Sequence, residues 1–238
     1  MPFRMGLLAE AVSVAAGADL LLYWQLPQIL HWHTRVVGFL LELAEVPWEA
    51  GRQITLLPGV TAELVRTSYL DYQDHPLYPW YFLGAAVLLL AGYRWWPAPL
   101  KPILLLIQAS LAVTFLYLQL VSPSVPYSPE DFCAIWYRGE TYLWLLLPLL
   151  FAMCYFILTV PFWMKLSWLC LLVSYSFLWS AVRLALGLAT FHHFGSLWMP
   201  LFYFVFGFLA DFLYIVAFYS LAMDRAAVFL VKQKEVWQ

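Results

Sequence analysis

The chain has 238 residues, of which 64% are hydrophobic, 19% are aromatic and only 11% are charged. Soluble domains carry about a quarter charged residues, so this composition excludes a water-soluble globular protein and indicates a polytopic membrane protein surrounded by lipid. The net charge of −2 and the scatter of the basic residues along the chain exclude a nucleic-acid-binding protein.

Apolar runs of spanning length predict an all-α fold, a polytopic transmembrane helix bundle of about six spans. The first span, Met5–Trp24, is weak because Glu10 and Asp19 interrupt it. The five clear spans are Tyr78–Trp96, Pro102–Val121, Tyr142–Val160, Leu166–Leu188 and Trp198–Ala222. No internal repeat or linker divides the chain, so residues 1–238 are expected to form one domain.

The segment Gln25–Leu77 is the only long stretch predicted to lie outside the membrane. Within it, Val36–Ala44 has apolar residues at helical spacing, which predicts a helix lying on the membrane or capping the bundle. Asp71, Asp74 and His75 are interpreted as solvated loop residues rather than metal ligands. We therefore predict neither a metal nor a cofactor.

The basic residues of the short loops predict the orientation, because Lys and Arg favour the cytoplasmic side. They alternate consistently with six spans, which places both termini in the cytoplasm. The predicted location is the inner (cytoplasmic) membrane, crossed several times. The residues that carry this prediction are Arg94, Lys101, Lys165, Arg225, Lys232 and Lys234.

Four residues near the outer face form a candidate catalytic set: Cys133, Arg183, His192 and His193. Cys133 is predicted in a polar loop before a span, where a thiolate nucleophile can be activated by a nearby cation. A histidine can take the thiol proton, and a buried arginine can stabilise an oxyanion. A cysteine that only fills space, an arginine that reaches the headgroups and interfacial histidines are the alternatives.

Asp211 lies within the last predicted span, in the sequence FGFLADFLY. An ionisable group there costs at least about 2.5 kcal/mol if it has no partner. We expect a structural pairing with Arg183 or a tyrosine, and a proton relay is the alternative.

The C-terminal half resembles the exosortase/archaeosortase family of integral-membrane cysteine transpeptidases. The resemblance lies in FCAIWYRG at Phe132–Gly139, in the basic turn PFWMK at Pro161–Lys165, and in LWSAVRLALGLATFHHFG at Leu178–Gly195. The chain departs from the family at Ala134-Ile135, where Ser-Gly is usual, and at Ser180, where Asn is usual. Its histidines also precede the glycine turn at Gly195 instead of following it.

The resemblance implies a membrane cysteine protease or transpeptidase that processes C-terminal sorting signals of exported proteins on the outer face. Its partners would be exported proteins ending in a hydrophobic helix and a basic tail. Cys133 would be the nucleophile, Arg183 the stabilising cation, and His193, or else His192, the general base. Two alternatives remain. One is a non-catalytic accessory subunit of a protein-sorting or surface-polymer export system, and the other is a small transporter that uses Asp211, Glu10 and Asp19 as intramembrane charges.

Overall fold

The computed structural model describes residues 5–69, 78–120, 128–195 and 198–236. It is mostly helical, at 82%, as the sequence predicts. The long helices are α1 (Met5–Leu43), α2 (Tyr78–Gly92), α3 (Lys101–Leu120), α4 (Pro129–Tyr155), α5 (Phe162–Phe194) and α7 (Ala210–Val236). Short helical segments join them: η2 (Tyr93–Trp95), η3 (Ala98–Leu100), α6 (Met199–Leu201) and the π-helical η5 (Phe202–Leu209).

Three helical segments are long and apolar enough to cross a membrane: Ala98–Tyr117, Phe162–Phe194 and Phe202–Val231. A fourth, Leu83–Trp95, is apolar but shorter. The predicted span Tyr142–Val160 extends past the end of α4, which stops at Tyr155. By length and composition, the described chain therefore has three candidate spans.

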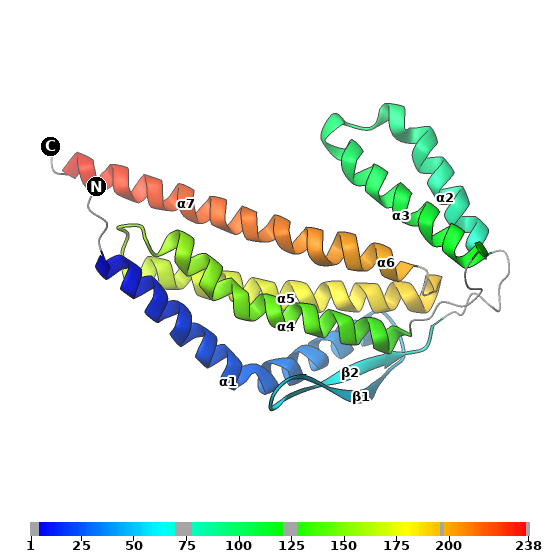
Figure 1. Ribbon diagram of the computed structural model, residues 1–238, viewed down its shortest axis with the longest axis horizontal. Coiled ribbons are helices and arrows are strands. Elements are labelled where there is room, and N and C mark those ends of the chain that lie inside the picture. The colour runs from blue at the N-terminus through cyan, green and yellow to red at the C-terminus, as the bar shows by residue number, and fades with distance from the viewer. Residues whose placement is uncertain (1–4, 70–77, 121–127, 196–197, 237–238) are drawn as a thin grey trace.

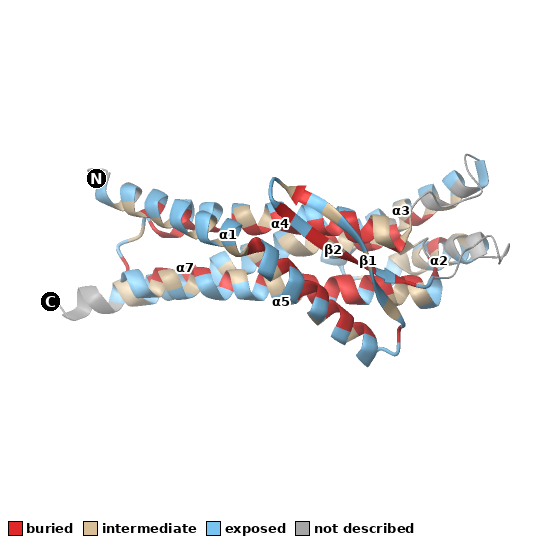
Figure 2. Ribbon diagram, turned by 90° about the horizontal axis from the view of Figure 1, so that it is seen from below, coloured by how far each residue is buried: buried red, intermediate tan, exposed pale blue. Residues whose placement is uncertain are grey.

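Helices α1, α4, α5 and α7 form an elongated bundle in which α4 and α5 run antiparallel (Figure 1). The start of α1 and the end of α7 lie at the same end of this bundle (Figure 1). Helices α2 and α3 pack on each other and meet the remaining structure chiefly at α6. In the most apolar stretch of α5, 44% of the residues are buried. In the most apolar stretch of the η5–α7 segment, Phe202–Val231, only 11% are buried. Helix α5 is therefore central, and α7 presents most of its surface outward (Figure 2).

A β-hairpin corrects the all-α prediction. Strands β1 (Trp48–Leu57) and β2 (Val60–Thr67) pair antiparallel and join through Pro58-Gly59, where Gly59 has φ +75°. Glycine adopts this left-handed conformation without steric cost. The Pro-Gly pair and the β-branched residues beside it are a hairpin signal that the prediction missed. Strand β2 buries Leu64 and Val65 completely, so the hairpin covers one side of the bundle.

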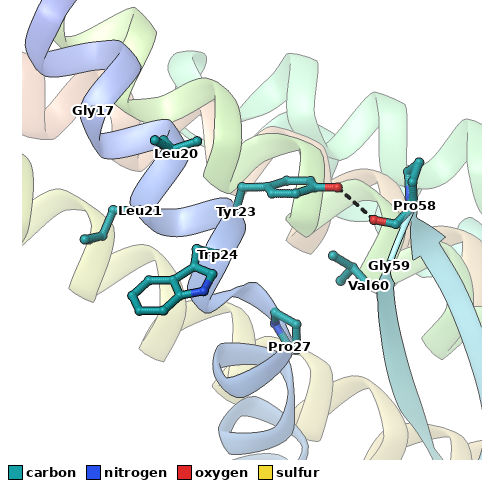
Figure 3. Close-up of a pocket in the computed structure, with 9 residues that line it drawn as sticks. All are labelled: Gly17, Leu20, Leu21, Tyr23, Trp24, Pro27, Pro58, Gly59 and Val60. Carbon is teal, nitrogen blue, oxygen red and sulfur yellow. Dashed lines mark hydrogen bonds between the residues drawn. The ribbon is translucent and has the colours of Figure 1, made fainter.

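Helix α1 bends near Pro27, inside the helix, because proline removes one backbone hydrogen bond and crowds the preceding turn (Figure 1). The predicted helix Val36–Ala44 falls largely in the second half of α1, which packs on α4 and α5. Beside the bend, a largely apolar hollow of about 710 Å³ separates α1 from the hairpin turn (Figure 3). The Tyr23 hydroxyl spans it and donates to the carbonyl of Pro58 at 2.7 Å.

Gly38 allows α1 to approach β1 closely. A Cβ atom at this position would lie 2.2 Å from a ring carbon of Trp48, and the Trp48 indole is held by a 3.1 Å hydrogen bond to Glu42. We expect Gly38→Ala to displace the ring and to lower the free energy of unfolding by about 1–3 kcal/mol. Thermal unfolding in detergent, followed by tryptophan fluorescence, measures the change.

Gly17, in the same helix, is the matched control because a Cβ atom there would meet nothing within 4 Å. Gly17→Ala should raise stability by about 0.5–1 kcal/mol, since alanine loses less backbone entropy than glycine in a helix. If the two alanine variants unfolded at the same temperature, the close contact of Gly38 with Trp48 would have no energetic importance.

Candidate functional site

Cys133 lies in helix α4 and not in the polar loop that the sequence predicted. Ser128 caps this helix and forms a reciprocal capping box with Asp131, and Pro129 occupies the first turn. These residues are strong helix-start signals, so α4 begins well before the apolar run at Tyr142. The sequence prediction began the span at Tyr142, left the residues before it in a loop, and so misplaced the thiol.

The Cys133 side chain is 0% exposed, and its environment includes the backbone of Val65 in β2. Burial raises the pKa of the Cys133 thiol to about 12, although the Val65 backbone hydrogen bond lowers it slightly. A thiol with this pKa is neutral at physiological pH. In the described arrangement, Cys133 is therefore a covered thiol and not an activated thiolate.

The last turn of α5 contains the two histidines. The rings of Phe132 and Phe191 meet edge to face with centroids 4.7 Å apart, so the first turn of α4 packs against the last turn of α5. Cys133 and His192 follow these two rings in the sequence. The Nδ1 atom of His192 lies 3.0 Å from the carbonyl oxygen of Ser68 and 3.1 Å from its hydroxyl. His193 is exposed.

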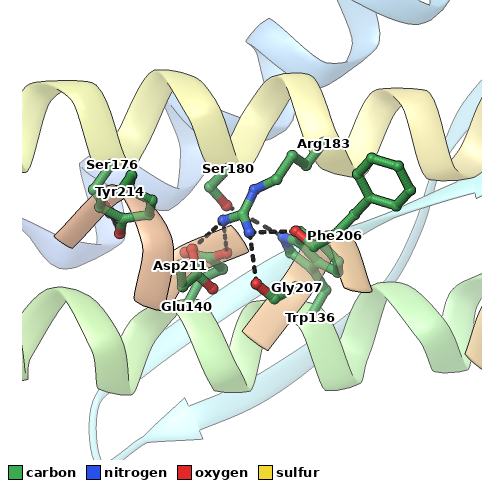
Figure 4. A network of polar contacts seen from close by, with 9 residues as sticks. All are labelled: Trp136, Glu140, Ser176, Ser180, Arg183, Phe206, Gly207, Asp211 and Tyr214. Carbon is green, nitrogen blue, oxygen red and sulfur yellow. Dashed lines mark hydrogen bonds and ion pairs between the residues drawn. The ribbon is translucent and has the colours of Figure 1, made fainter. Parts of the chain in front are cut away.

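Arg183 belongs to a separate buried cluster (Figure 4). Its side chain is 1% exposed and bridges Glu140 at 2.8 Å and Asp211 at 2.5 Å. The expected pairing of Asp211 with Arg183 is thus confirmed. Glu140 was not predicted as a partner because it precedes the predicted span that begins at Tyr142, whereas α4 carries it into the bundle.

The π-helical segment η5 supplies the remaining partners of Arg183. The guanidinium donates to the carbonyl of Phe206, and to that of Gly207 at 2.9 Å. A π-helix shifts the backbone pairing by one residue and often marks a functional position. The guanidinium also lies 5.2 Å from the centre of the Trp136 ring, a cation–π contact that partly replaces water.

The structure therefore brings together only part of the predicted set. Glu140, the α4 partner of Arg183, is seven residues from Cys133, which corresponds to about 10 Å along a helix. Among the residues described, no hydrogen bond or ion pair joins Cys133 to Arg183, His192 or His193. Cys133 and His192 lie near the ends of α4 and α5 that the Phe132–Phe191 contact joins, and the Arg183–Glu140 pair lies further along the two helices.

A groove of about 330 Å³ opens beside the arginine cluster, between α4 and the η5–α7 segment. Its polar residues include Glu140 and Asp211, and most of its wall is aromatic or aliphatic. The Oε2 atom of Glu140 is buried and has no hydrogen-bond partner. Sequence reasoning did not find this groove, because it depends on the contact of two helices that are far apart in the chain.

Buried polar residues also connect α1 to the hairpin and α4. The Thr34 hydroxyl lies 2.8 Å from the Tyr137 hydroxyl and donates to the carbonyl of Glu63 at 3.1 Å. The His33 ring packs edge to face on Tyr137. This network helps to hold the hairpin over the turn of α4 that contains Cys133.

The structure defines a mostly helical protein with three candidate membrane spans, a covering β-hairpin and a buried arginine cluster. No protein family, curated protein or solved structure matches the chain. Within the described ranges, no group of three or more His, Cys, Asp or Glu side chains could hold a metal ion. Asp71, Asp74 and His75, interpreted above as solvated loop residues, lie outside the described residues.

Proposed function

We propose that this protein is an exosortase-like membrane cysteine transpeptidase that processes C-terminal sorting signals of exported proteins. One observation supports the proposal: the Phe132–Phe191 contact packs the first turn of α4, which contains Cys133, against the last turn of α5, which contains His192. The resemblance in sequence from Phe132 to Gly195 supports the same assignment. The substrates would be exported proteins with a C-terminal hydrophobic helix and a basic tail.

In the proposed reaction, the Cys133 sulfur attacks the carbonyl carbon of the scissile peptide bond, and a histidine takes the thiol proton. The carbon–nitrogen bond breaks, the histidine returns this proton to the departing amine, and the acyl group remains on sulfur as a thioester. An acceptor nucleophile then attacks the thioester and releases the thiol. His192 suits the base role better than the exposed His193, because Ser68 holds its ring.

The proposal requires the hairpin to move, because the hairpin covers Cys133. Exposed ion pairs join the hairpin to the start of α4: Arg52 to Asp131 at 2.7 Å, and Arg66 to Glu130 at 3.6 Å. Exposed pairs contribute only about 0–1 kcal/mol each. The larger resistance to opening comes from the buried apolar residues of β2, so the open form would be a minor state until a substrate stabilises it.

We further propose that the protein crosses the inner (cytoplasmic) membrane about six times, with both termini in the cytoplasm. The shared position of the start of α1 and the end of α7 supports an even number of crossings (Figure 1). The distribution of Lys and Arg in the short loops supports the orientation. Cys133 and His192 would then face the outer side.

The second candidate is a non-catalytic accessory subunit of a protein-sorting or surface-polymer export system. Full burial of Cys133, together with its raised pKa, favours this function. The departures at Ala134-Ile135 and Ser180 favour it as well. In such a subunit, Cys133 fills space beneath the hairpin, and the helix bundle binds other components of the system without catalysing a reaction.

Cys133→Ser separates the two candidates. In cells that export a reporter ending in an apolar helix and a basic tail, we expect the substitution to abolish processing of the reporter, because a serine hydroxyl is a far weaker nucleophile than a thiolate. Immunoblotting measures the processed fraction and the amount of the variant protein. Cys154→Ser and Cys170→Ser are the matched controls, since both of these thiols are exposed and lie elsewhere.

Unchanged processing in Cys133→Ser at a normal protein level would refute the catalytic proposal. The rate of thiol alkylation gives an independent answer. Because burial raises the pKa of the Cys133 thiol to about 12, very little of it is ionised at pH 8, and alkylation should be slow. If the thiol stays unreactive when a signal-bearing substrate is added, the accessory function is favoured, whereas faster alkylation shows that the hairpin opens.

A further inference from the structure

The arginine cluster has one more negative than positive formal charge. Glu140 and Asp211 are its carboxylates and Arg183 is its cation; among the described residues, the ion pairs of both acids involve Arg183 alone. The four donor contacts of Arg183 are directed to these two acids and to the carbonyls of η5. Arg183 therefore leaves the second oxygen of Glu140 without a partner.

That unpaired oxygen belongs to a residue that lines the groove between α4 and η5–α7. Glu140 is 4% exposed, so bulk water does not solvate it as it would a surface acid. A buried carboxylate oxygen without a partner is costly. A cation in the groove would remove this cost by pairing with the carboxyl group.

The walls of the groove favour an organic cation over a bare metal ion. The groove provides only two carboxylate side chains, and aromatic rings dominate the remaining surface; such rings attract ammonium and guanidinium groups. The aromatic residues that line it are Trp136, Tyr142, Tyr203, Phe208 and Phe212. A basic side chain combines a charged group with an apolar stem, as this surface requires.

We propose that the groove receives a lysine or arginine side chain from an apolar helix of a partner protein. The volume of about 330 Å³ accommodates a long side chain but not a helix about 10 Å across. The rim is apolar and open, with Tyr142 59%, Phe208 78% and Phe212 59% exposed, and it offers the backbone of such a helix a surface to pack on. A basic residue within a membrane requires a carboxylate partner of this kind.

This inference is independent of the proposed chemistry of Cys133. The groove belongs to the arginine cluster, and among the described residues no hydrogen bond or ion pair joins that cluster to the thiol. A failure of Cys133→Ser to change processing would leave the docking proposal intact, and a failure of docking would leave the catalytic proposal intact.

The test uses the full chain in phosphatidylcholine nanodiscs and a dansyl-labelled polyleucine helix of about 20 residues with one central lysine. The matched peptide carries methionine in place of lysine. Energy transfer from the tryptophans of the protein to dansyl measures binding. We expect the lysine peptide to bind at least about tenfold more tightly than the methionine peptide, because the lysine ammonium can pair with the carboxyl groups of the cluster and the methionine side chain cannot.

Glu140→Gln should reduce this preference to less than about twofold, because the amide removes the excess charge and still accepts a hydrogen bond from Arg183. Asp211→Asn provides a second variant with the same charge change if the first does not fold. Asp224→Asn is the control, since Asp224 is exposed on α7, and it should keep the full preference.

Equal binding of the two peptides by the wild-type protein would overturn the proposal. A lysine preference that survives both Glu140→Gln and Asp211→Asn would also overturn it, by locating the contact elsewhere. If the preference disappears when phosphatidylethanolamine replaces phosphatidylcholine, a lipid ammonium occupies the groove and the proposed protein partner is wrong.

Discussion

Arg183→Ala is expected to lower the free energy of unfolding by about 3–5 kcal/mol, because removing one member of a buried ion pair leaves uncompensated charge. The substitution leaves Glu140 and Asp211 close together without a cation. It also frees the carbonyls of Phe206 and Gly207, which Arg183 now binds. Thermal unfolding of the detergent-solubilised protein, followed by near-UV circular dichroism, measures the loss.

Two comparisons control for this effect. Arg225→Ala removes an exposed arginine from α7 and should change the stability by less than about 0.5 kcal/mol. The triple variant Arg183→Met, Glu140→Gln, Asp211→Asn should recover most of the loss, because no unpaired charge remains. A loss in Arg183→Ala no greater than that in Arg225→Ala would show that the cluster does not stabilise the bundle.

Lys165→Ala is expected to lower the free energy of unfolding by about 2–3 kcal/mol. This loss is smaller than the loss expected for a fully buried ion pair, because Glu10 is partly exposed to solvent. The lysine side chain is 2% exposed and donates to Glu10 at 2.9 Å, and also to the carbonyl of Phe156 at 2.8 Å. These contacts join the start of α1 to the turn between α4 and α5. Urea unfolding in detergent measures the loss.

A double-mutant cycle identifies the ion pair as the cause. Lys165→Ala and Glu10→Ala should together cost less than the sum of their separate losses, since each alone breaks the same contact. Lys101→Ala is the control. Among the described residues, the Lys101 side chain interacts with the Tyr93 ring at 5.0 Å and forms no ion pair, so its loss should cost less than about 1 kcal/mol. Additive losses for Lys165 and Glu10 would contradict the pairing.

The helical content could be predicted because long apolar runs contain enough residues to satisfy every backbone hydrogen bond within one helix. The pairing of Asp211 with Arg183 could also be predicted, since a charge inside an apolar helix requires a partner. The sequence prediction missed the hairpin, although the Pro58-Gly59 pair indicates a turn. Cys133 was predicted in a loop because the predicted span begins at Tyr142, whereas helix α4 begins directly after its Ser128 cap.

The amino-acid sequence by itself determined the apolar character of the chain, its helical content and the need to pair its buried charges, because these follow from local composition and from the cost of unpaired polar groups. Only the tertiary structure decided which partners meet. Helix α4 brings Glu140 to Arg183, β2 covers Cys133, and Lys165 reaches Glu10 across 155 positions of sequence. Such contacts depend on how helices pack against one another, and no local pattern records that arrangement.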